Sequence, residues 1–128
     1  MRVEQDVKLT FNDVLIRPKR STLVSRSDVN LEREFSFRHS DEKWCGIPIV
    51  SANMDTTGLF SVAKVLQKYK MLTCTQKFYS TKEFINSWEE GVNPEYIAIT
   101  CGSTENSFEL VRRKVATNDN LKMICIDV

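Results

Sequence analysis

Residues 71–100 read MLTCTQKFYSTKEFINSWEEGVNPEYIAIT, and this stretch decides the fold class. It opens with a short apolar segment, residues 71–75, that predicts a buried strand. Ser80 and Glu83 then match a capping box, in which a hydroxyl and a carboxylate satisfy free N–H groups at a helix start. A second apolar segment, residues 96–100, predicts another strand. The stretch is therefore a strand–helix–strand unit.

The same alternation extends in both directions. Before the unit, residues 47–50 predict a strand, and residues 59–66 carry apolar side chains at the i, i+3, i+4 and i+7 positions of a helix. After it, residues 108–115 predict a helix and residues 121–127 a fourth strand. Strands rich in Ile and Val with helices between them indicate an α/β fold with a parallel sheet covered by helices. An open doubly wound sheet and part of a closed barrel both fit this pattern.

Composition narrows the class of protein. The chain has 128 residues, of which 41% are apolar, which suits one domain with a modest core. Lys and Arg number 18 against 17 Asp and Glu, and this balance argues against a nucleic-acid partner. No apolar run approaches the ~20 residues of a membrane helix, and the first residues lack the apolar segment of a secretory signal. We therefore expect a cytoplasmic protein with no membrane or nucleic-acid partner.

The first 45 residues differ from the rest because they are charged and irregular, with only short apolar pieces. We predict an N-terminal arm over residues 1–45. The four cysteines lie far apart, with no C-x-x-C pair and a single histidine in the chain, so no metal site is predicted. We expect them to be small, reduced core residues: Cys45, Cys74, Cys101 and Cys125.

Polar side chains follow each predicted strand, where ligands gather in both candidate architectures. Residues 51–56, Lys77, residues 101–104 and Asp127 occupy these positions. Most of these residues have a simpler interpretation. Asp55 and the threonines after it would cap a helix, Lys77 would be a solvated loop residue, and Gly102 would serve only a turn. No G-x-G-x-x-G segment follows the first strand and no Walker-type loop is present, which argues against a Rossmann or P-loop site.

Three segments resemble one enzyme family. Residues 11–22 (FNDVLIRPKRST) resemble its N-terminal signature, residues 51–56 (SANMDT) its first-strand motif, and residues 124–128 (ICIDV) its fourth strand. The family is that of IMP dehydrogenase and GMP reductase, and the forms of the first two segments favour the GMP reductase branch. The resemblance runs along the whole chain. It implies a partial TIM (β/α)8 barrel, with an arm over 1–45 and a truncated first half-barrel over 46–128 that holds about four strands and three helices.

The resemblance also implies a reaction. Members of this branch reduce GMP to IMP with NADPH and release ammonia, and a cysteine thiolate attacks the purine carbon that bears the amino group. That cysteine lies in a later, glycine-rich loop, and the family's potassium site is built around the same loop. We therefore expect no catalytic residue and no metal site within these 128 residues, and no activity from them alone. By resemblance the full protein is a homotetramer, with GMP and IMP as its ligands.

Six residues match family positions that contact ligands. The expected NADPH contacts are Ser25, Arg26, Lys77, Asp127 and Val128. Met54 is expected near the nucleotide base. Three positions depart from the family pattern: Gln76 and Phe78 stand where histidines are usual, and Cys101 replaces a serine.

Two other interpretations stay open at this point. The first is that the chain is a fragment of an IMP dehydrogenase, which oxidises IMP with NAD. The second is that it is a short, non-catalytic protein that binds nucleotide or other subunits.

Overall fold

The computed structural model describes residues 6–128, which fall into two units, one up to Asn30 and one from Leu31 to Val128. The first unit contains two short 3-10 turns, η1 (Phe11–Asp13) and η2 (Arg26–Asp28). Its described residues are all exposed to solvent. This unit therefore has no core of its own within the described range.

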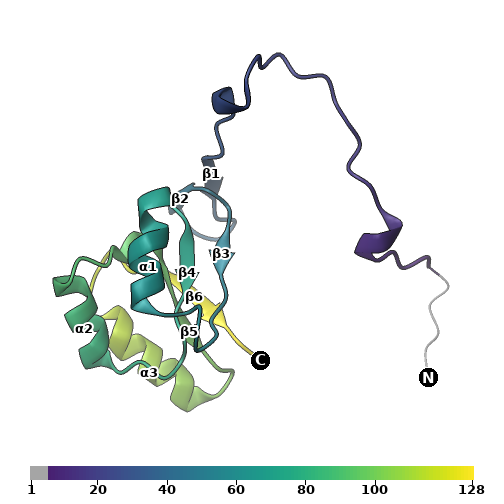
Figure 1. The fold of residues 1–128 in the computed structure, drawn as a ribbon. Helices are drawn as coiled ribbons and strands as arrows, with labels where there is room; N and C mark the ends of the chain where they lie inside the picture. The colour runs from purple at the N-terminus through teal and green to yellow at the C-terminus, as the bar shows by residue number, and fades with distance from the viewer. Residues whose placement is uncertain (1–5) are drawn as a thin grey trace. The chain divides into compact units, whose positions relative to one another are not determined.

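The second unit holds all the α-helices and strands that the structure describes (Figure 1). In chain order its elements are β1 (Arg33–Ser36), β2 (Lys43–Gly46), β3 (Val50–Ser51), α1 (Phe60–Leu66), η3 (Gln67–Tyr69), β4 (Leu72–Cys74), α2 (Thr81–Glu89), η4 (Pro94–Tyr96), β5 (Ile97–Cys101), α3 (Glu105–Val115) and β6 (Met123–Ile126).

Strands β3 to β6 form one parallel sheet in the order β3-β4-β5-β6. Helices α1, α2 and α3 connect β3 to β4, β4 to β5 and β5 to β6, so neighbours in the sheet are also neighbours in the chain. The prediction of an α/β fold with a parallel sheet is confirmed.

The first strand of this sheet is shorter than predicted. Residues 47–50 were expected to form it, but the ladder begins at Val50. Pro48 has no N–H to donate, and the N–H of Ile49 donates to the carbonyl of Ile47 at 2.7 Å instead of to a neighbouring strand. The N–H of Ile47 still donates to Lys70 O at 2.9 Å, so the segment follows the edge of the sheet without the regular ladder.

An antiparallel hairpin, β1–β2, precedes the sheet in the same unit. Trp44 and Gly46 are its buried residues, and the indole N–H of Trp44, which is 8% exposed, donates to Glu95 O at 3.1 Å. This contact ties the hairpin to the segment that leads into β5. Residues 31–45 thus group with the second unit, whereas the boundary between arm and half-barrel after residue 45 stays a prediction.

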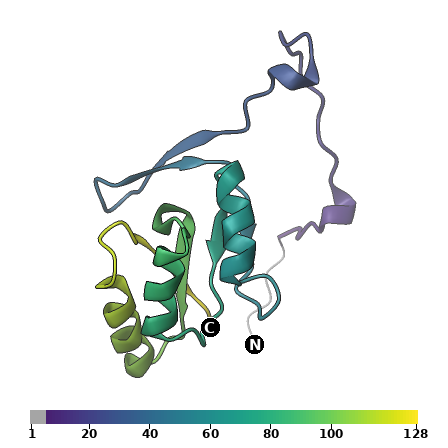
Figure 2. The same cartoon turned by 60° about the vertical axis from the view of Figure 1, so that its left-hand side comes forward.

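The helices pack on the sheet around β5, all five residues of which are buried. Figure 2 shows α1, α2 and α3 beside one another on one side of the strands. The buried cluster draws on all of these elements and consists of Ala63, Phe84, Val92, Ile97, Ile99, Cys101, Val111 and Leu121. Burial of this apolar surface is the main stabilising contribution that the fold offers.

Helix α2 begins with the predicted capping box. The hydroxyl of Ser80 accepts from the N–H of Glu83 at 3.3 Å, and the carboxylate of Glu83 accepts from the N–H of Ser80 at 2.7 Å. The sequence predicts that Phe84, Ile85 and Trp88 form the apolar face of this helix. Phe84 and Trp88 do face the core, but Ile85 is 43% exposed, so the prediction is wrong at that position. The helix ends at Glu89, and Gly91 just beyond it has a φ of +89°, which suits a residue without a Cβ.

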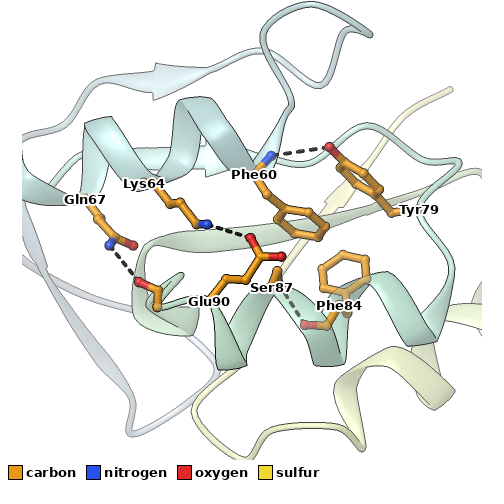
Figure 3. A network of polar contacts seen from close by, with 8 residues as sticks. Phe60, Lys64, Gln67, Tyr79, Phe84, Ser87 and Glu90 are labelled. Atoms are coloured by element: carbon orange, nitrogen blue, oxygen red, sulfur yellow. Dashed lines mark hydrogen bonds and ion pairs between the residues drawn. The ribbon is translucent and has the colours of Figure 1, made fainter.

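Helices α1 and α2 contact each other through rings and one ion pair (Figure 3). The Phe60 ring centroid lies 5.0 Å from that of Phe84, in an edge-to-face arrangement. The backbone N–H of Phe60 donates to the Tyr79 hydroxyl at 3.3 Å. Lys64 Nζ lies 2.7 Å from Glu90 Oε2. These contacts fix how α1 lies against α2, and with it the loops at the carboxyl ends of β3 and β4.

Candidate functional site

Four of the predicted site residues follow strands of the parallel sheet. Met54 follows β3, Lys77 follows β4, and Asp127 and Val128 follow β6. Because these strands are parallel and adjacent, their carboxyl ends meet at one edge of the sheet. The structure therefore brings these four residues to the same edge. Ser25 and Arg26 belong to the other unit.

The loop between β3 and α1 is closed by its own hydrogen bonds. The Ser51 hydroxyl donates to Thr57 O and the Thr57 hydroxyl donates to Ala52 O, both at 2.9 Å. Met54 is 60% exposed on this loop. Asp55 does not cap α1, because the helix begins only at Phe60 and its start has no side-chain cap. The capping interpretation of Asp55 is thus wrong, and the loop presents its side chains to solvent.

Gly58 brings the same loop against the end of β4. Its carbonyl accepts from the N–H of Gln76 at 2.9 Å. A Cβ at this position would lie 2.6 Å from Gln76 N and 2.8 Å from Cys74 O, both backbone atoms that cannot move aside cheaply. The close approach joins the β3 and β4 ends of the candidate site into one surface.

The β4–α2 loop carries Lys77 and Phe78. The side chain of Gln76 accepts from the N–H of Phe78 at 2.7 Å and so shapes this turn. Lys77 Nζ lies 5.6 Å from the Phe78 ring centroid, within the range of a weak cation–π contact. Lys77 is exposed and has no ion pair with any described residue. Its ammonium is free to receive an anionic ligand.

Cys101 ends β5 in the core, only 3% exposed. Burial raises the pKa of its thiol, which keeps the sulfur protonated at neutral pH and makes it a poor nucleophile. Cys74, on the neighbouring strand, is half-buried, and burial together with the Cys125 thiol raises its pKa to about 12. Cys45 lies on β2 and is exposed, so the expectation of a buried core residue is wrong there.

Asp127 links the end of β6 to β5. Its backbone N–H donates to Cys101 O at 2.8 Å, while its side chain is exposed. The carboxylate therefore faces solvent at the candidate edge, where a ligand hydroxyl or amide could reach it.

Ser25, in the first unit, caps η2. Its hydroxyl accepts from the N–H of Ser27 at 3.2 Å, and Arg26 beside it is exposed.

One residue beside Lys77 escaped the sequence interpretation. Lys114, in the last turn of α3, is 5% exposed, and its Nζ donates to Lys77 O at 3.5 Å. A signal was present, because Lys114 follows Val111 by three residues and so falls on the apolar face of the predicted helix. A lysine on a buried face is rare.

Residues 6–128 contain no cluster of three or more His, Cys, Asp or Glu side chains that could hold a metal ion. Among the same residues, no helix has the length and apolar character needed to cross a bilayer.

Curated relatives match the chain along its entire length. A GMP reductase of Shigella boydii serotype 18 is 49% identical over 131 residues, and one of Klebsiella pneumoniae is 47% identical over the same span. In both cases the alignment covers 100% of this chain and 38% of the relative. The chain belongs to the IMP dehydrogenase/GMP reductase family. It corresponds to an N-terminal portion of the GMP reductases and spans a little over a third of their length.

A solved structure supports the fold of this family. The IMP dehydrogenase of Legionella pneumophila superimposes with a TM-score of 0.68 over 93% of this chain and 35% of that one, at 24% sequence identity. No protein-family model matches the chain. The fold of the chain is thus similar to that of an IMP dehydrogenase.

Proposed function

We propose that this chain is the N-terminal part of a (β/α)8 barrel that reduces GMP to IMP with NADPH and releases ammonia. The observation that carries the proposal is the sequence identity of 47–49% to GMP reductases along the whole chain. Four consecutive parallel strands, each followed by a helix or a loop at the same edge, support the barrel. A homotetramer in the cytoplasm is part of the same proposal.

The exposed cation at the candidate edge suits the cofactor. Lys77 presents an ammonium without a carboxylate partner among the described residues, and such a group can hold a phosphate. Asp127 and Val128 would hold the cofactor beside it, and Ser25 with Arg26 would contact the NADPH bound to a neighbouring subunit. When bound, NADPH supplies the hydride for the reduction. Met54, exposed and flexible, would contact the purine base.

In this proposal the residues of the chain bind and orient, and none acts as the nucleophile. Cys101 is buried with a raised pKa, which argues against that role. The cysteine loop and the potassium site would be provided by the remaining part of the barrel.

A fusion tests the proposal. Residues 1–128 are joined to the part of the Klebsiella pneumoniae GMP reductase that follows the matched region. The fusion should oxidise NADPH only when GMP is present. The loss of nicotinamide absorbance measures this oxidation. A folded fusion that consumes no NADPH with GMP would contradict the assignment. Activity with IMP and NAD instead would favour IMP dehydrogenase, the second candidate, which the structural match alone supports.

Within that fusion, Lys77→Ala should raise the KM for NADPH by about tenfold, with a smaller change in the KM for GMP, because one charge-assisted contact to the cofactor is lost. Lys82→Ala, which removes an exposed lysine from α2, is the matched control and should change neither constant. Equal effects of Lys77→Ala on both substrates would mean that the lysine is structural.

Residues 1–128 alone should not oxidise NADPH in the presence of GMP, since no nucleophile is available. The measurement is the same absorbance assay on the purified chain. GMP-dependent oxidation that Cys101→Ser abolishes would show that the buried thiol is catalytic after all.

A further inference from the structure

A hollow of about 190 Å³ lies between the β4–α2 loop and α3. Lys77 and Phe78 line it from the loop, and Gly102 and Ser107 line it from the start of the β5–α3 connection and the first turn of α3. Lys114 lines it from the last turn of that helix. Two lysines from different elements thus share one small cavity, and one of the two is buried.

The environment of Lys114 is unusual for a lysine. Its side chain is buried, and no carboxylate among the described residues lies within ion-pair distance of its Nζ. The ammonium has three donors, of which one makes the long bond to Lys77 O. The Phe84 ring, 5.3 Å from Nζ, attracts the charge only weakly.

The acidic group that attracts Lys114 is already engaged. Glu83 shares one carboxylate oxygen between the backbone N–H and the hydroxyl of Ser80, both at 2.7 Å. Burial consequently outweighs the attraction of Glu83 and lowers the pKa of Lys114. A buried ammonium with unused donors favours a counter-anion in the adjoining space.

Two further features beside the hollow favour an anion. Lys77 contributes a second, exposed ammonium on the loop side. Ser107 lies in the first turn of α3, an eleven-residue helix whose N-terminal end carries partial positive charge. The cavity has the liquid volume of about six water molecules, at ~30 Å³ each, which is ample for a tetrahedral oxyanion.

We propose that this hollow binds a phosphate group between Lys77 and Lys114, beside the first turn of α3. A phosphate offers oxygens in several directions, which matches donors that converge from a loop and a helix. The group comes either from free inorganic phosphate or from a dinucleotide cofactor bound at Lys77. The inference rests on the hollow and its lysines, and it does not require that the proposed reductase activity is correct.

The first experiment is a thermal melt of the whole chain titrated with inorganic phosphate, with sodium chloride added to hold the ionic strength constant. The Tm should rise with phosphate and saturate. Lys114→Met removes the charge and keeps the length of the side chain, so without phosphate it should melt at a higher temperature than the wild type. Its apparent affinity for phosphate should fall at least about tenfold. Lys82→Met, with the same charge change at an exposed site, should respond like the wild type.

The second experiment is a direct titration of Lys114 by NMR, which does not depend on unfolding. Its pKa should rise when phosphate is added, because a bound anion stabilises the charged form. Lys77→Met, which changes only an exposed side chain, should also weaken the phosphate response, and this variant serves if Lys114→Met does not fold. A response to phosphate that survives both substitutions, or a Lys114 pKa that phosphate leaves unchanged, overturns the proposal.

Competition with NADPH identifies the source of the phosphate. Loss of the phosphate response at saturating NADPH means that a cofactor phosphate occupies the hollow, and an additive response means that free phosphate does. Either result supports the site. A phosphate response in the chain together with an inactive fusion would refute the reductase proposal and leave this inference intact.

Discussion

Strands β5 and β6 lie side by side in the sheet and are almost equally apolar, yet they differ in burial. Ile99 pairs with Ile124, and Cys101 pairs with Ile126, so these side chains point to the same face of the sheet. Ile99 is fully buried, whereas Ile124 is 50% exposed and Ile126 is 58% exposed. Helix α3 packs on β5, and no helix follows β6 in the described residues. Burial here is decided by what covers a strand rather than by its composition.

The largest expected effect comes from the paired isoleucines. Ile99→Ala should lower the free energy of unfolding by about 2–5 kcal/mol, because it leaves a cavity in a packed core. Ile124→Ala, one strand away in register, should cost about 1 kcal/mol or less, since half of its side chain is already in water. Urea unfolding of the two variants measures the difference. Equal costs would show that β6 is covered in solution and would break the comparison.

A smaller effect is expected at the start of the helix that covers β5. The Thr104 hydroxyl accepts from the N–H of Ser107 at 3.3 Å and caps α3. Thr104→Ala should lower the free energy of unfolding by about 1 kcal/mol, because one N–H of the first turn loses its partner. Thr104→Ser keeps the cap and serves as the control in the same denaturation experiment. A loss as large in the serine variant would assign the effect to the threonine methyl group instead.

The smallest effect concerns pH and the cap of α2. The hydrogen bonds from the backbone N–H and hydroxyl of Ser80 lower the pKa of Glu83 below its ordinary value of 4.5. The folded state therefore prefers the ionised carboxylate, and this contribution is fully present above about pH 4.5 and lost as the pH falls through the lowered pKa. The stability difference between wild type and Glu83→Gln should shrink over that interval. Urea midpoints that differ equally at all pH values would exclude this linkage.

Local patterns predicted most of the second unit. The capping box at Ser80 and the alternation of apolar strands and helices were readable because each depends on residues close in sequence. The same applies to Met54, Lys77 and Asp127, whose positions after strands placed them at one edge. Their roles as ligand contacts rest on resemblance and stay a prediction.

The misses depend on contacts between distant segments. The hairpin is not evident from local pattern, because Trp44 is buried partly through contacts with distant residues: its indole N–H donates to Glu95 O, 51 residues away, and its ring lies 6.3 Å from the Tyr96 ring. Sequence spacing places Ile85 on the apolar face of α2, but the side chain is 43% exposed because burial depends on which neighbouring segments reach it. Lys114 was passed over because a lysine is ordinarily solvated, and only the packing of α2 against α3 shows that it is not.

The two tryptophans provide built-in optical reporters for the two halves of the second unit. The fluorescence of Trp44 reports on the attachment of the hairpin, because its indole N–H donates to Glu95 O. The fluorescence of Trp88 reports on the contact between α2 and the end of α3, because its indole N–H donates to the Thr117 hydroxyl at 3.1 Å. Trp44→Phe and Trp88→Phe each leave a single emitting indole. Fluorescence of the two variants during unfolding therefore distinguishes a hairpin that detaches early from one that opens together with the sheet.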